Sequence, residues 1–365
     1  MKKIVSILLA VAMILCMCAC GGTNEAAAPA ETPKAAATTT QTAPAAPAAQ
    51  ADQAEEPNYV DFLCSITANE TQPHGMAMQL FADRLEELTD GQVTVDVNYS
   101  ATLYSSADEK VAIEAGDIDI CYGNASWLAT NSPWIGMLAA GYTYKNYDHM
   151  HAVLAGEIGK EVFKRVAEER NIVILGAMYQ GSRVISLCDD KAIIVPSDLK
   201  GINLRMPESA VYVNLGKAMG VNATPMALSE LYLALQTHAV DGQENPLSTI
   251  NAQKFYEVQD SISLTNHVVD SAWIVLNGDS WNKLTDKQKE LAYQAAAEAV
   301  ALCDETVLQQ ESELVGTFTD YGLSVYESDA DAFLSQVVSY YKDNGIAAEW
   351  DADIYQAIQD LAANY

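Results

Sequence analysis

Positive charge is scarce in this 365-residue sequence, which has 20 Lys and Arg against 49 Asp and Glu and a formal net charge of −29. Proteins that bind nucleic acid neutralise phosphates with Lys and Arg, so a general nucleic-acid role is excluded. The same imbalance argues against adhesion to anionic lipid. Screening confines charge effects to about 8 Å at physiological salt, so a local cation can still bind an anion.

Motifs for metal binding and nucleophilic catalysis are also lacking. The seven cysteines form no CxxC pair, and the five histidines are scattered. Cys64, Cys121, Cys188 and Cys303 lie in apolar stretches and are predicted to be buried free thiols, not a disulfide framework. No glycine-rich phosphate loop and no nucleophile–base pattern are found. We therefore expect a protein that is not an enzyme, without a cofactor or a metal.

One largely apolar run, residues 4–15, follows two lysines at the start of the chain. It is too short to span a bilayer and predicts a signal peptide over residues 1–19. The run ends in Met17-Cys18-Ala19-Cys20-Gly21, which resembles a bacterial lipobox and predicts lipidation of Cys20. The alternative is an ordinary secretory signal that is cut nearby.

Two regions follow the predicted signal peptide. Residues 20–57 are rich in Ala, Pro and Thr without hydrophobic periodicity, which predicts a disordered tether. The remaining ~300 residues exceed one hydrophobic core, so two lobes are expected. Helical and strand patterns alternate along them, which indicates an α/β fold.

Local patterns predict many of the elements. Apolar periodicity favours helices over residues 73–89, 106–115 and 151–170, and a long helix that begins at Thr285 with a Thr285–Gln288 capping box. Two more helices are expected within residues 329–365. Strands are predicted over residues 59–66, 92–99, 118–122, 172–178, 184–187 and 202–206.

The stretch from Ser229 to Gln259 reads as helix, strand, turn and helix. Its strand is predicted over residues 239–244 and ends at Asn245, since Pro246 cannot donate a ladder hydrogen bond. A second helical pattern runs over residues 247–258. Asn245 therefore lies at the carboxyl end of a strand, where open α/β sheets bind ligands.

This stretch resembles the solute-binding proteins of TRAP transporters, also called extracytoplasmic solute receptors, which serve in the uptake of organic acids. The resemblance covers residues 59–365. It is densest in five motifs: GSRVIS (181–186), VPSDLKGINLRMPES (195–209), ATPMALSELY (223–232), ALQTHAVDGQENPLSTINAQKFYEVQ (234–259) and TNH (265–267).

The resemblance implies a two-lobed, periplasmic-binding-protein-like (type II) clamshell with a long interlobe helix. Lobe I is expected to hold residues 58–181 and 271–310, and lobe II residues 182–270 and 311–365. The strands near 181 and 270 would form the hinge. The helix that begins at Thr285 is the candidate for the interlobe helix.

The resemblance also implies that Arg205 pairs with the carboxylate of the ligand. A guanidinium is always charged and its planar fork matches a carboxylate. The alternative is an internal structural ion pair. Arg183 is placed near the same carboxylate, although it could instead brace the interlobe strand. Asn245 matches a ligand-contacting asparagine, although it could form an Asx turn before Pro246.

Four further contact positions follow from the family's sialic-acid binders: Thr67, Asn124, Trp127 and Leu228. Those binders carry Glu, Arg and Phe where this chain has Asn124, Trp127 and Leu228, so a smaller or more apolar carboxylate than sialic acid is favoured. Tyr179 and Trp273 could add an aromatic wall, although aromatic residues more often belong to the core. His267 is expected to be a structural hydrogen-bonding residue.

The expected function is therefore a monomeric extracytoplasmic binding protein. It would capture a small-molecule carboxylate by clamshell closure and deliver it to the small and large membrane subunits. It would lie at the outer face of the bacterial cell membrane, held by its lipid anchor alone, or in the periplasm. The alternative is a ligand sensor of the same fold that serves a histidine kinase or chemoreceptor.

Overall fold

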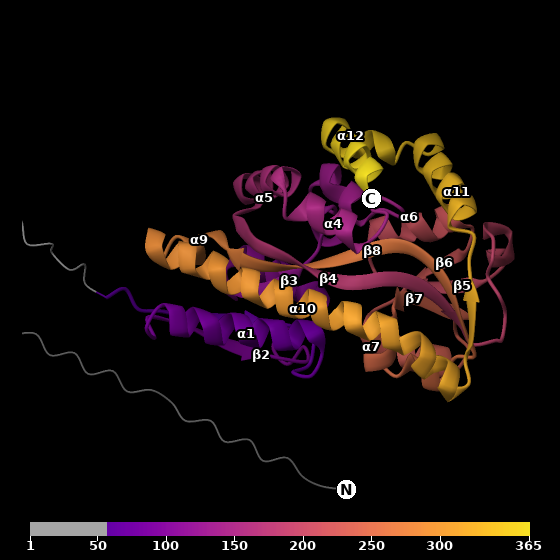
Figure 1. The fold of residues 1–365 in the computed structure, drawn as a ribbon, viewed down its shortest axis with the longest axis horizontal. Coiled ribbons are helices and arrows are strands. Elements are labelled where there is room, and N and C mark those ends of the chain that lie inside the picture. The colour runs from indigo at the N-terminus through magenta and orange to yellow at the C-terminus, as the bar shows by residue number, and fades with distance from the viewer. Residues whose placement is uncertain (1–56) are drawn as a thin grey trace, which may run out of the picture. The chain divides into compact units, whose positions relative to one another are not determined.

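A computed structural model describes residues 57–365, which lie in one compact unit (Figure 1). The predicted signal peptide, Cys20 and nearly all of the predicted tether lie outside the described residues. Within residues 57–365, no helix has both the length and the apolar character needed to cross a membrane. The four predicted thiols are buried and free, as expected: Cys64, Cys121, Cys188 and Cys303.

A single nine-stranded sheet forms the centre of the unit, with the order β2-β1-β3-β8-β4-β7-β5-β6 and with β9 paired to β8. At one end, three strands run parallel: β1 (Val60–Ser65), β2 (Val93–Asn98) and β3 (Ile120–Gly123). At the other end, a second parallel group is formed by β5 (Asn203–Met206), β6 (Asn222–Pro225) and β7 (Gly242–Pro246).

Two long antiparallel strands, β4 (Ile172–Leu187) and β8 (Ser261–Asn277), connect the two groups. The predicted strands over residues 172–178 and 184–187 are thus parts of one strand. β8 was predicted only as a crossing near residue 270. The pairing of β8 with β4 shifts its register beside Gly181, where β4 has a bulge between Tyr179 and Gly181.

Twelve α-helices cover the sheet in the described chain (Figure 1). They are α1 (Pro73–Leu88), α2 (Ser106–Ala115), α3 (Ala125–Leu128), α4 (Tyr147–Leu154), α5 (Glu157–Arg170), α6 (Ala210–Met219), α7 (Leu228–Gln236), α8 (Leu247–Ala252), α9 (Gly278–Trp281), α10 (Asp286–Tyr321), α11 (Ala330–Asp343) and α12 (Ala352–Leu361). Strand β9 (Ser324–Glu327) follows α10.

Three local predictions were wrong in detail. The helix predicted over residues 151–170 is two helices, with Gly156 between α4 and α5 as the N-cap of the second. The helix predicted over 247–258 ends at Ala252, because Lys254 adopts a left-handed conformation. Strand β7 begins at Gly242 and includes Pro246, because His238 turns the chain with a φ of 53° before it.

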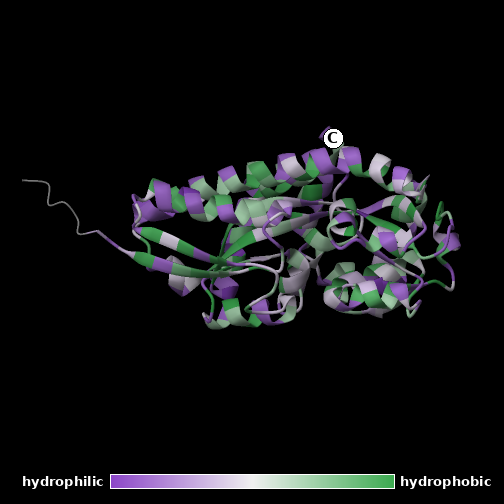
Figure 2. Ribbon diagram, turned by 90° about the horizontal axis from the view of Figure 1, so that it is seen from below, coloured by the Kyte–Doolittle hydropathy of each residue, from purple (hydrophilic) through white to green (hydrophobic). Residues whose placement is uncertain are grey.

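The long helix α10 begins as predicted, with the Thr285–Gln288 capping box in place, and extends over 36 residues. Residues from Ala292 to Val307 pack into the hydrophobic cluster around β1–β3, whereas Leu314 and Phe318 pack into a second cluster around α7 and α8. Figure 2 shows hydrophilic and hydrophobic residues alternating along this helix. It therefore lies against both ends of the sheet.

The hydrophobic interior of the described chain forms three clusters. The largest lies around β1–β3, and the other two lie around β5–α6–α11 and around α7 and α8. Ile354 and Ile358 of α12 belong to the largest cluster, although the C-terminus was expected to pack with the other end of the sheet. The boundaries of the two lobes stay a prediction.

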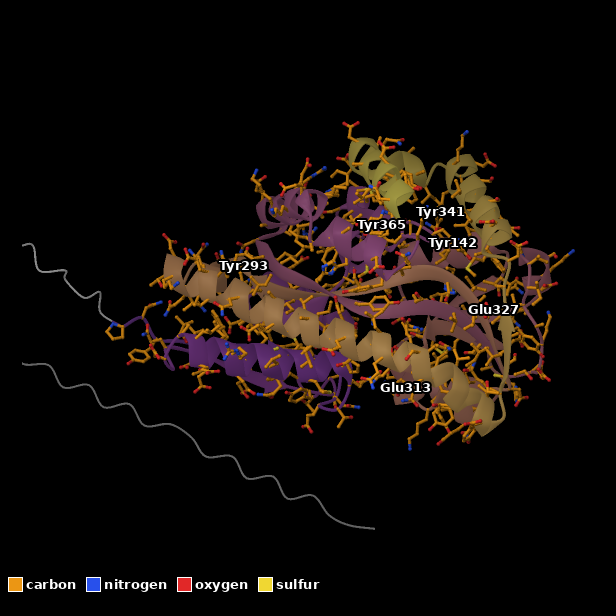
Figure 3. The ribbon with its side chains drawn as sticks, viewed as in Figure 1. Tyr142, Tyr293, Glu313, Glu327, Tyr341 and Tyr365 are labelled. Atoms are coloured by element: carbon orange, nitrogen blue, oxygen red, sulfur yellow. The ribbon has the colours of Figure 1, made fainter. Side chains whose placement is uncertain are left out.

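Two carboxylates of α10 hold the bulge of β4 in place. Asp304 accepts a hydrogen bond from the Tyr179 amide at 2.6 Å, and Glu311 accepts one from the Ser182 amide at 2.6 Å. The Tyr179 hydroxyl also donates to Glu311 at 2.8 Å. Glu313, two residues further along α10 and labelled in Figure 3, is exposed. The interior face of α10 thus fixes the point where the chain crosses between the two strand groups.

Gly181, inside this bulge, has a φ of +112°, and an added Cβ would lie 2.8 Å from Cβ of Pro246. We expect Gly181→Ala to lower the free energy of unfolding by about 2–4 kcal/mol, because left-handed strain and overpacking add. Gly322→Ala is the matched control, with a φ of +118° and no atom within 4 Å of the added Cβ. It should lose only about 1–2 kcal/mol. Urea unfolding of both variants tests this, and equal losses would contradict it.

Candidate functional site

Both groups of parallel strands point their carboxyl ends toward one segment of the β4–β8 pair. This segment, residues 177–183 of β4 and 268–273 of β8, is called the crossing. The end of β3 pairs with the middle of β8, as Gly123 pairs with Trp273. From the other side, the end of β7 pairs with the middle of β4, as Pro246 pairs with Arg183. In α/β sheets, ligands bind beyond the carboxyl ends of parallel strands. The topology therefore brings two such edges to one place.

Arg205 lies near the end of β5 at this place and is 3% exposed. Its Nε and Nη2 donate to the carbonyl oxygen of Met226 at 2.9 and 2.7 Å. Burial lowers the pKa of the Arg205 guanidinium to about 10, with an opposing effect from Glu244 and a further lowering by Arg183. Arg205 is therefore charged at pH 7, although a backbone carbonyl is its hydrogen-bond partner.

The other four arginines of the sequence all have a carboxylate partner. Arg84 pairs with Glu87 and Glu298, Arg165 with Glu169 and Asp351, Arg170 with Glu114, and Arg183 with Glu244 and Asp270. Among residues 57–365, Arg205 has no carboxylate within 4 Å. A buried guanidinium without a counter-ion is unfavourable unless another anion pairs with it.

Arg183, on β4, lies in an internal network of ion pairs. Its Nε and Nη2 donate to the two carboxylate oxygens of Glu244 at 2.5 and 2.8 Å, and its Nη1 donates to Asp270 at 2.9 Å. The Asn245 side-chain oxygen accepts from Nη2 at 3.1 Å. These contacts match the bracing role that was considered for Arg183, and they occupy all three of its nitrogens. A direct ligand contact by Arg183 stays a prediction.

Glu244 is fully buried and keeps its negative charge. Burial raises the pKa of this carboxyl, but the Arg183 charge and the hydrogen bond with His267 outweigh it and lower the pKa to about 2. His267 Nε2 lies 3.0 Å from Glu244, and its Nδ1 lies 2.7 Å from the Thr265 hydroxyl. His267 therefore makes the structural hydrogen bonds expected of it.

Asp270, the second partner of Arg183, also accepts a hydrogen bond from the Tyr212 hydroxyl at 3.0 Å. Burial raises the pKa of Asp270, although the Arg183 charge and the Tyr212 bond act against this. The Arg183 guanidinium lies 4.8 Å from the centre of the Tyr212 ring. β4, β7, β8 and α6 thus meet through charged and hydrogen-bonded side chains.

The remaining predicted contact residues lie on connections around the crossing. The Thr67 hydroxyl pairs with the Tyr122 hydroxyl at 2.5 Å, and the Asn124 side chain caps α3 by accepting from the Trp127 amide at 3.1 Å. Leu228 is the first residue of α7 and is 38% exposed. The Trp127 ring packs against Gly123 and lines a cavity of about 70 Å³ with Lys110 and Asn131.

The two aromatic residues considered for a wall are both core residues. Tyr179 is 2% exposed and Trp273 is fully buried. Trp273 packs edge-on against Phe163 and donates to the Ser271 hydroxyl at 3.0 Å. Neither observation assigns a ligand to them.

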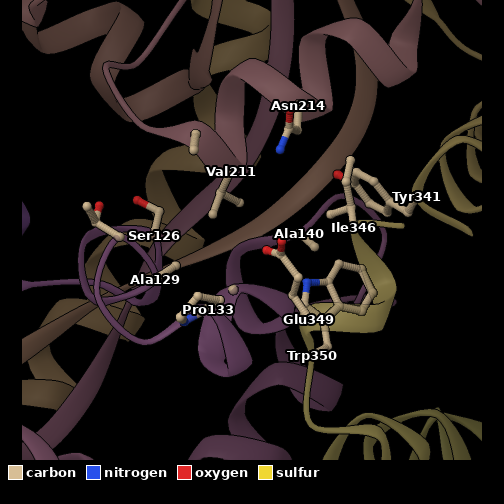
Figure 4. A pocket seen from close by; sticks show the side chains of 13 residues that line it. Ser126, Ala129, Pro133, Ala140, Val211, Asn214, Tyr341, Ile346, Glu349 and Trp350 are labelled. Atoms are coloured by element: carbon tan, nitrogen blue, oxygen red, sulfur yellow. The ribbon is translucent and has the colours of Figure 1, made fainter. Parts of the chain in front are cut away.

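A second cavity of about 70 Å³ lies away from Arg205, beneath the link between α11 and α12 (Figure 4). Glu349 and Trp350 of this link face Ala129, Pro133 and Val211 across it. The link itself is tied to α5, because Arg165 pairs with Asp351 at 2.8 Å. This cavity therefore separates the C-terminal link from α6 and the segment after α3.

Comparisons with known proteins agree with this arrangement. The family described as bacterial extracellular solute-binding protein, family 7 (DctP), matches residues 64–345. The chain belongs to this family.

Proteins similar to this chain include the sialic acid-binding periplasmic protein SiaP of Vibrio cholerae. It is 32% identical over 280 residues, which cover 77% of this chain and 85% of SiaP. A TRAP periplasmic solute-binding protein of Roseobacter denitrificans, solved with 3-deoxy-D-manno-oct-2-ulosonic acid, is 35% identical with a TM-score of 0.79. The match covers 83% of this chain and 99% of that one.

A second Roseobacter denitrificans structure, with bound L-galactonate, is 28% identical with a TM-score of 0.75, over 83% of this chain and 99% of that one. The two-lobed periplasmic-binding fold and the extracytoplasmic solute-binding function for a TRAP transporter are thereby confirmed. Family 7 consists of solute-binding proteins of transport systems.

Sequence reasoning missed Glu244 and Asp270, which neutralise Arg183, and Tyr212, whose hydroxyl donates to Asp270. Their signal was weak: Glu244 precedes Asn245 in a strand that is buried throughout, and Asp270 stands alone in the apolar run of β8. An acidic residue within a buried strand requires a cationic partner. That rule would have paired these acids with Arg183 once the strands were known to be adjacent.

We expect Glu244→Gln to lower the free energy of unfolding by about 3–5 kcal/mol at pH 7, because Arg183 loses a buried charge partner. The folded pKa of Glu244 is about 2, below its unfolded value, so its contribution is complete above about pH 4.5 and falls as the pH approaches 2. Urea unfolding from pH 7 to pH 3 should therefore show a shrinking gap between variant and wild type.

The control is Glu86→Gln, at an exposed position of α1. It should change the unfolding free energy by less than about 0.5 kcal/mol at every pH. A gap for Glu244→Gln that stays constant down to pH 3 would show that the Arg183 network does not depend on the charge of Glu244.

Proposed function

We propose that this family 7 protein captures an organic acid by pairing the ligand's carboxylate with Arg205. The observation that carries the proposal is the buried, charged Arg205 guanidinium, which has Met226 O as its partner and no carboxylate within 4 Å among the described residues. A ligand carboxylate would supply the missing counter-ion through charge-assisted hydrogen bonds, each worth about 1.5–3 kcal/mol.

The ligands of the relatives support this proposal. They are sialic acid, 3-deoxy-D-manno-oct-2-ulosonic acid and L-galactonate, and each one is an acid. These relatives are 28–35% identical to this chain over most of its length. We propose Asn245, Thr67, Asn124, Trp127 and Leu228 as further contacts, and Arg183 as a residue near the same carboxylate.

We also propose that binding closes two lobes about β4 and β8. Lobe I would hold residues 58–181 and 271–310 and lobe II residues 182–270 and 311–365, except that α12 packs with the first lobe's cluster. The bulge at Gly181, fixed by Glu311, is the proposed pivot in β4. The acid would be released unchanged to the small and large membrane subunits, so no catalytic step is proposed.

We propose further that lipidation of Cys20 holds the protein at the outer face of the membrane. The support is the lipobox-like sequence before Gly21. Replacing Cys20 with Ser should move the protein from the membrane fraction to the soluble fraction. Membrane association that survives the replacement would contradict this anchor.

We expect Arg205→Ala to abolish measurable acid binding, because Ala removes both the charge and the fork. Arg205→Lys keeps the charge without the fork and should weaken binding by roughly ten- to a hundredfold, or about 1.4–2.8 kcal/mol. A thermal-shift screen of keto, sugar, aromatic and dicarboxylic acids identifies the ligand, since binding at 100 times Kd adds about 2.7 kcal/mol of stability. Calorimetry then measures the variants.

Two controls make this test specific. Arg170→Ala removes an arginine that pairs with Glu114 on α2 and should leave binding unchanged. The amide of the ligand should lose as much affinity as Arg205→Ala does, and the two losses should not add, because they remove one contact. Acid binding by a folded Arg205→Ala protein within about threefold of wild type would place the carboxylate anchor elsewhere.

A further inference from the structure

The connections that surround the crossing contain no Lys or Arg. Each connection begins directly after a parallel strand and includes the first two residues of the helix that follows. They are residues 66–74, 99–107, 124–126, 207–211, 226–229 and 247–248. Glu70 and Glu208 lie within them. These connections therefore offer a ligand only neutral or acidic groups, and Lys110, which lines a cavity with Trp127, belongs to the body of α2.

Uncharged hydrogen-bonding groups lie at the carboxyl ends of β1 and β3, in the strand group opposite the one that holds Arg205. The Thr67 and Tyr122 hydroxyls pair at 2.5 Å, and Asn124, directly after β3, caps α3 with its side-chain amide. Burial raises the pKa of Tyr122 to about 12, which keeps its hydroxyl protonated at neutral pH. These groups bind hydroxyl and carbonyl oxygens and do not compensate a full negative charge.

His74 is the one titratable group in these connections that could become a cation. It lies in the first turn of α1, with its ring 6.0 Å from that of Tyr122. Its Nε2 is buried and has no hydrogen-bond partner in the described part of the chain. Burial lowers the pKa of His74 to about 4, so the imidazole is neutral at pH 7.

We propose that the site accepts a hydroxylated acid with one carboxylate, and that it rejects the same molecule with a second carboxylate at its far end. This inference rests on the proposed function, because it takes Arg205 as the anchor of the first carboxylate. The far carboxylate would lie among Thr67, Tyr122, Asn124 and neutral His74. It would be removed from water without a cation to pair with it.

Matched acids test the inference on the purified protein by calorimetry. Each pair differs only in whether the terminal alcohol is oxidised to a carboxylate: D-gluconate and D-glucarate, D-galactonate and galactarate, D-erythronate and meso-tartrate, and 4-hydroxybutyrate and succinate. We expect the monoacid of at least one pair to bind, and its diacid to bind roughly 100-fold more weakly, since an uncompensated charge in the site costs several kcal/mol.

A charge placed in the far wall should reverse the preference. Thr67→Lys supplies a cation there, and Thr67→Gln is the matched uncharged control of similar length. Relative to Thr67→Gln, Thr67→Lys should raise the affinity for the diacid by roughly tenfold or more without raising that for the monoacid. Circular dichroism and thermal unfolding establish that both variants are folded.

The outcomes separate this inference from the proposed function. A wild-type protein that binds a diacid as tightly as its monoacid partner, with loss of binding in Arg205→Ala, overturns the inference and leaves the Arg205 anchor in place. The same holds if none of the pairs binds while another acid does so through Arg205. Ligand binding that Arg205→Ala does not weaken overturns the proposed function itself.

Discussion

The pairing of Arg183 with Glu244 and Asp270 is the interaction on which the site depends. Two guanidiniums are buried where the strand groups meet, and the two acids occupy all the nitrogens of one of them. Arg205, on β5, which β7 separates from β4, is left with a backbone carbonyl. The ion-pair network thereby decides which guanidinium is available to an incoming anion, and it does so inside a chain with a net charge of −29.

The sheet topology explains why these charges lie where a ligand can reach them. β4 and β8 run through both strand groups, so the carboxyl ends of β3 and β7 meet from opposite directions at the middle of these strands. α10 runs alongside and fixes the bulge of β4 through Asp304 and Glu311. The strand pairing thus places the charged residues at the crossing, and the contacts of α10 fix the backbone there.

Features encoded over a few residues were predictable from the sequence. The α10 capping box and the bounds of α2 depend on neighbours within one turn, and both were found as expected. β8 escaped prediction because 15 of its 17 residues are buried on both faces, so it lacks the alternation that identifies a half-exposed strand. Gly156, which separates α4 from α5, was overlooked inside an otherwise helical pattern.

The residues of the site also divide into those with a local sequence signal and those without one. Arg205 was singled out through the GINLRMP motif, but its lack of a carboxylate partner is a property of the assembled chain and has no local signal. Arg183 was assigned to the ligand on the same resemblance. Its partners, Glu244 and Asp270, stand 61 and 87 residues away, and only the adjacent strands bring them together.

The anchor and the residues proposed to select the ligand lie on different kinds of element. Arg205 belongs to a strand inside the sheet, whereas Thr67, Asn124 and Leu228 belong to connections or to the ends of helices that follow them. Substitutions in connections disturb the hydrophobic clusters less than substitutions in strands do. Duplicated genes with this architecture could therefore diverge in nutrient preference while they inherit the same carboxylate anchor and the same fold.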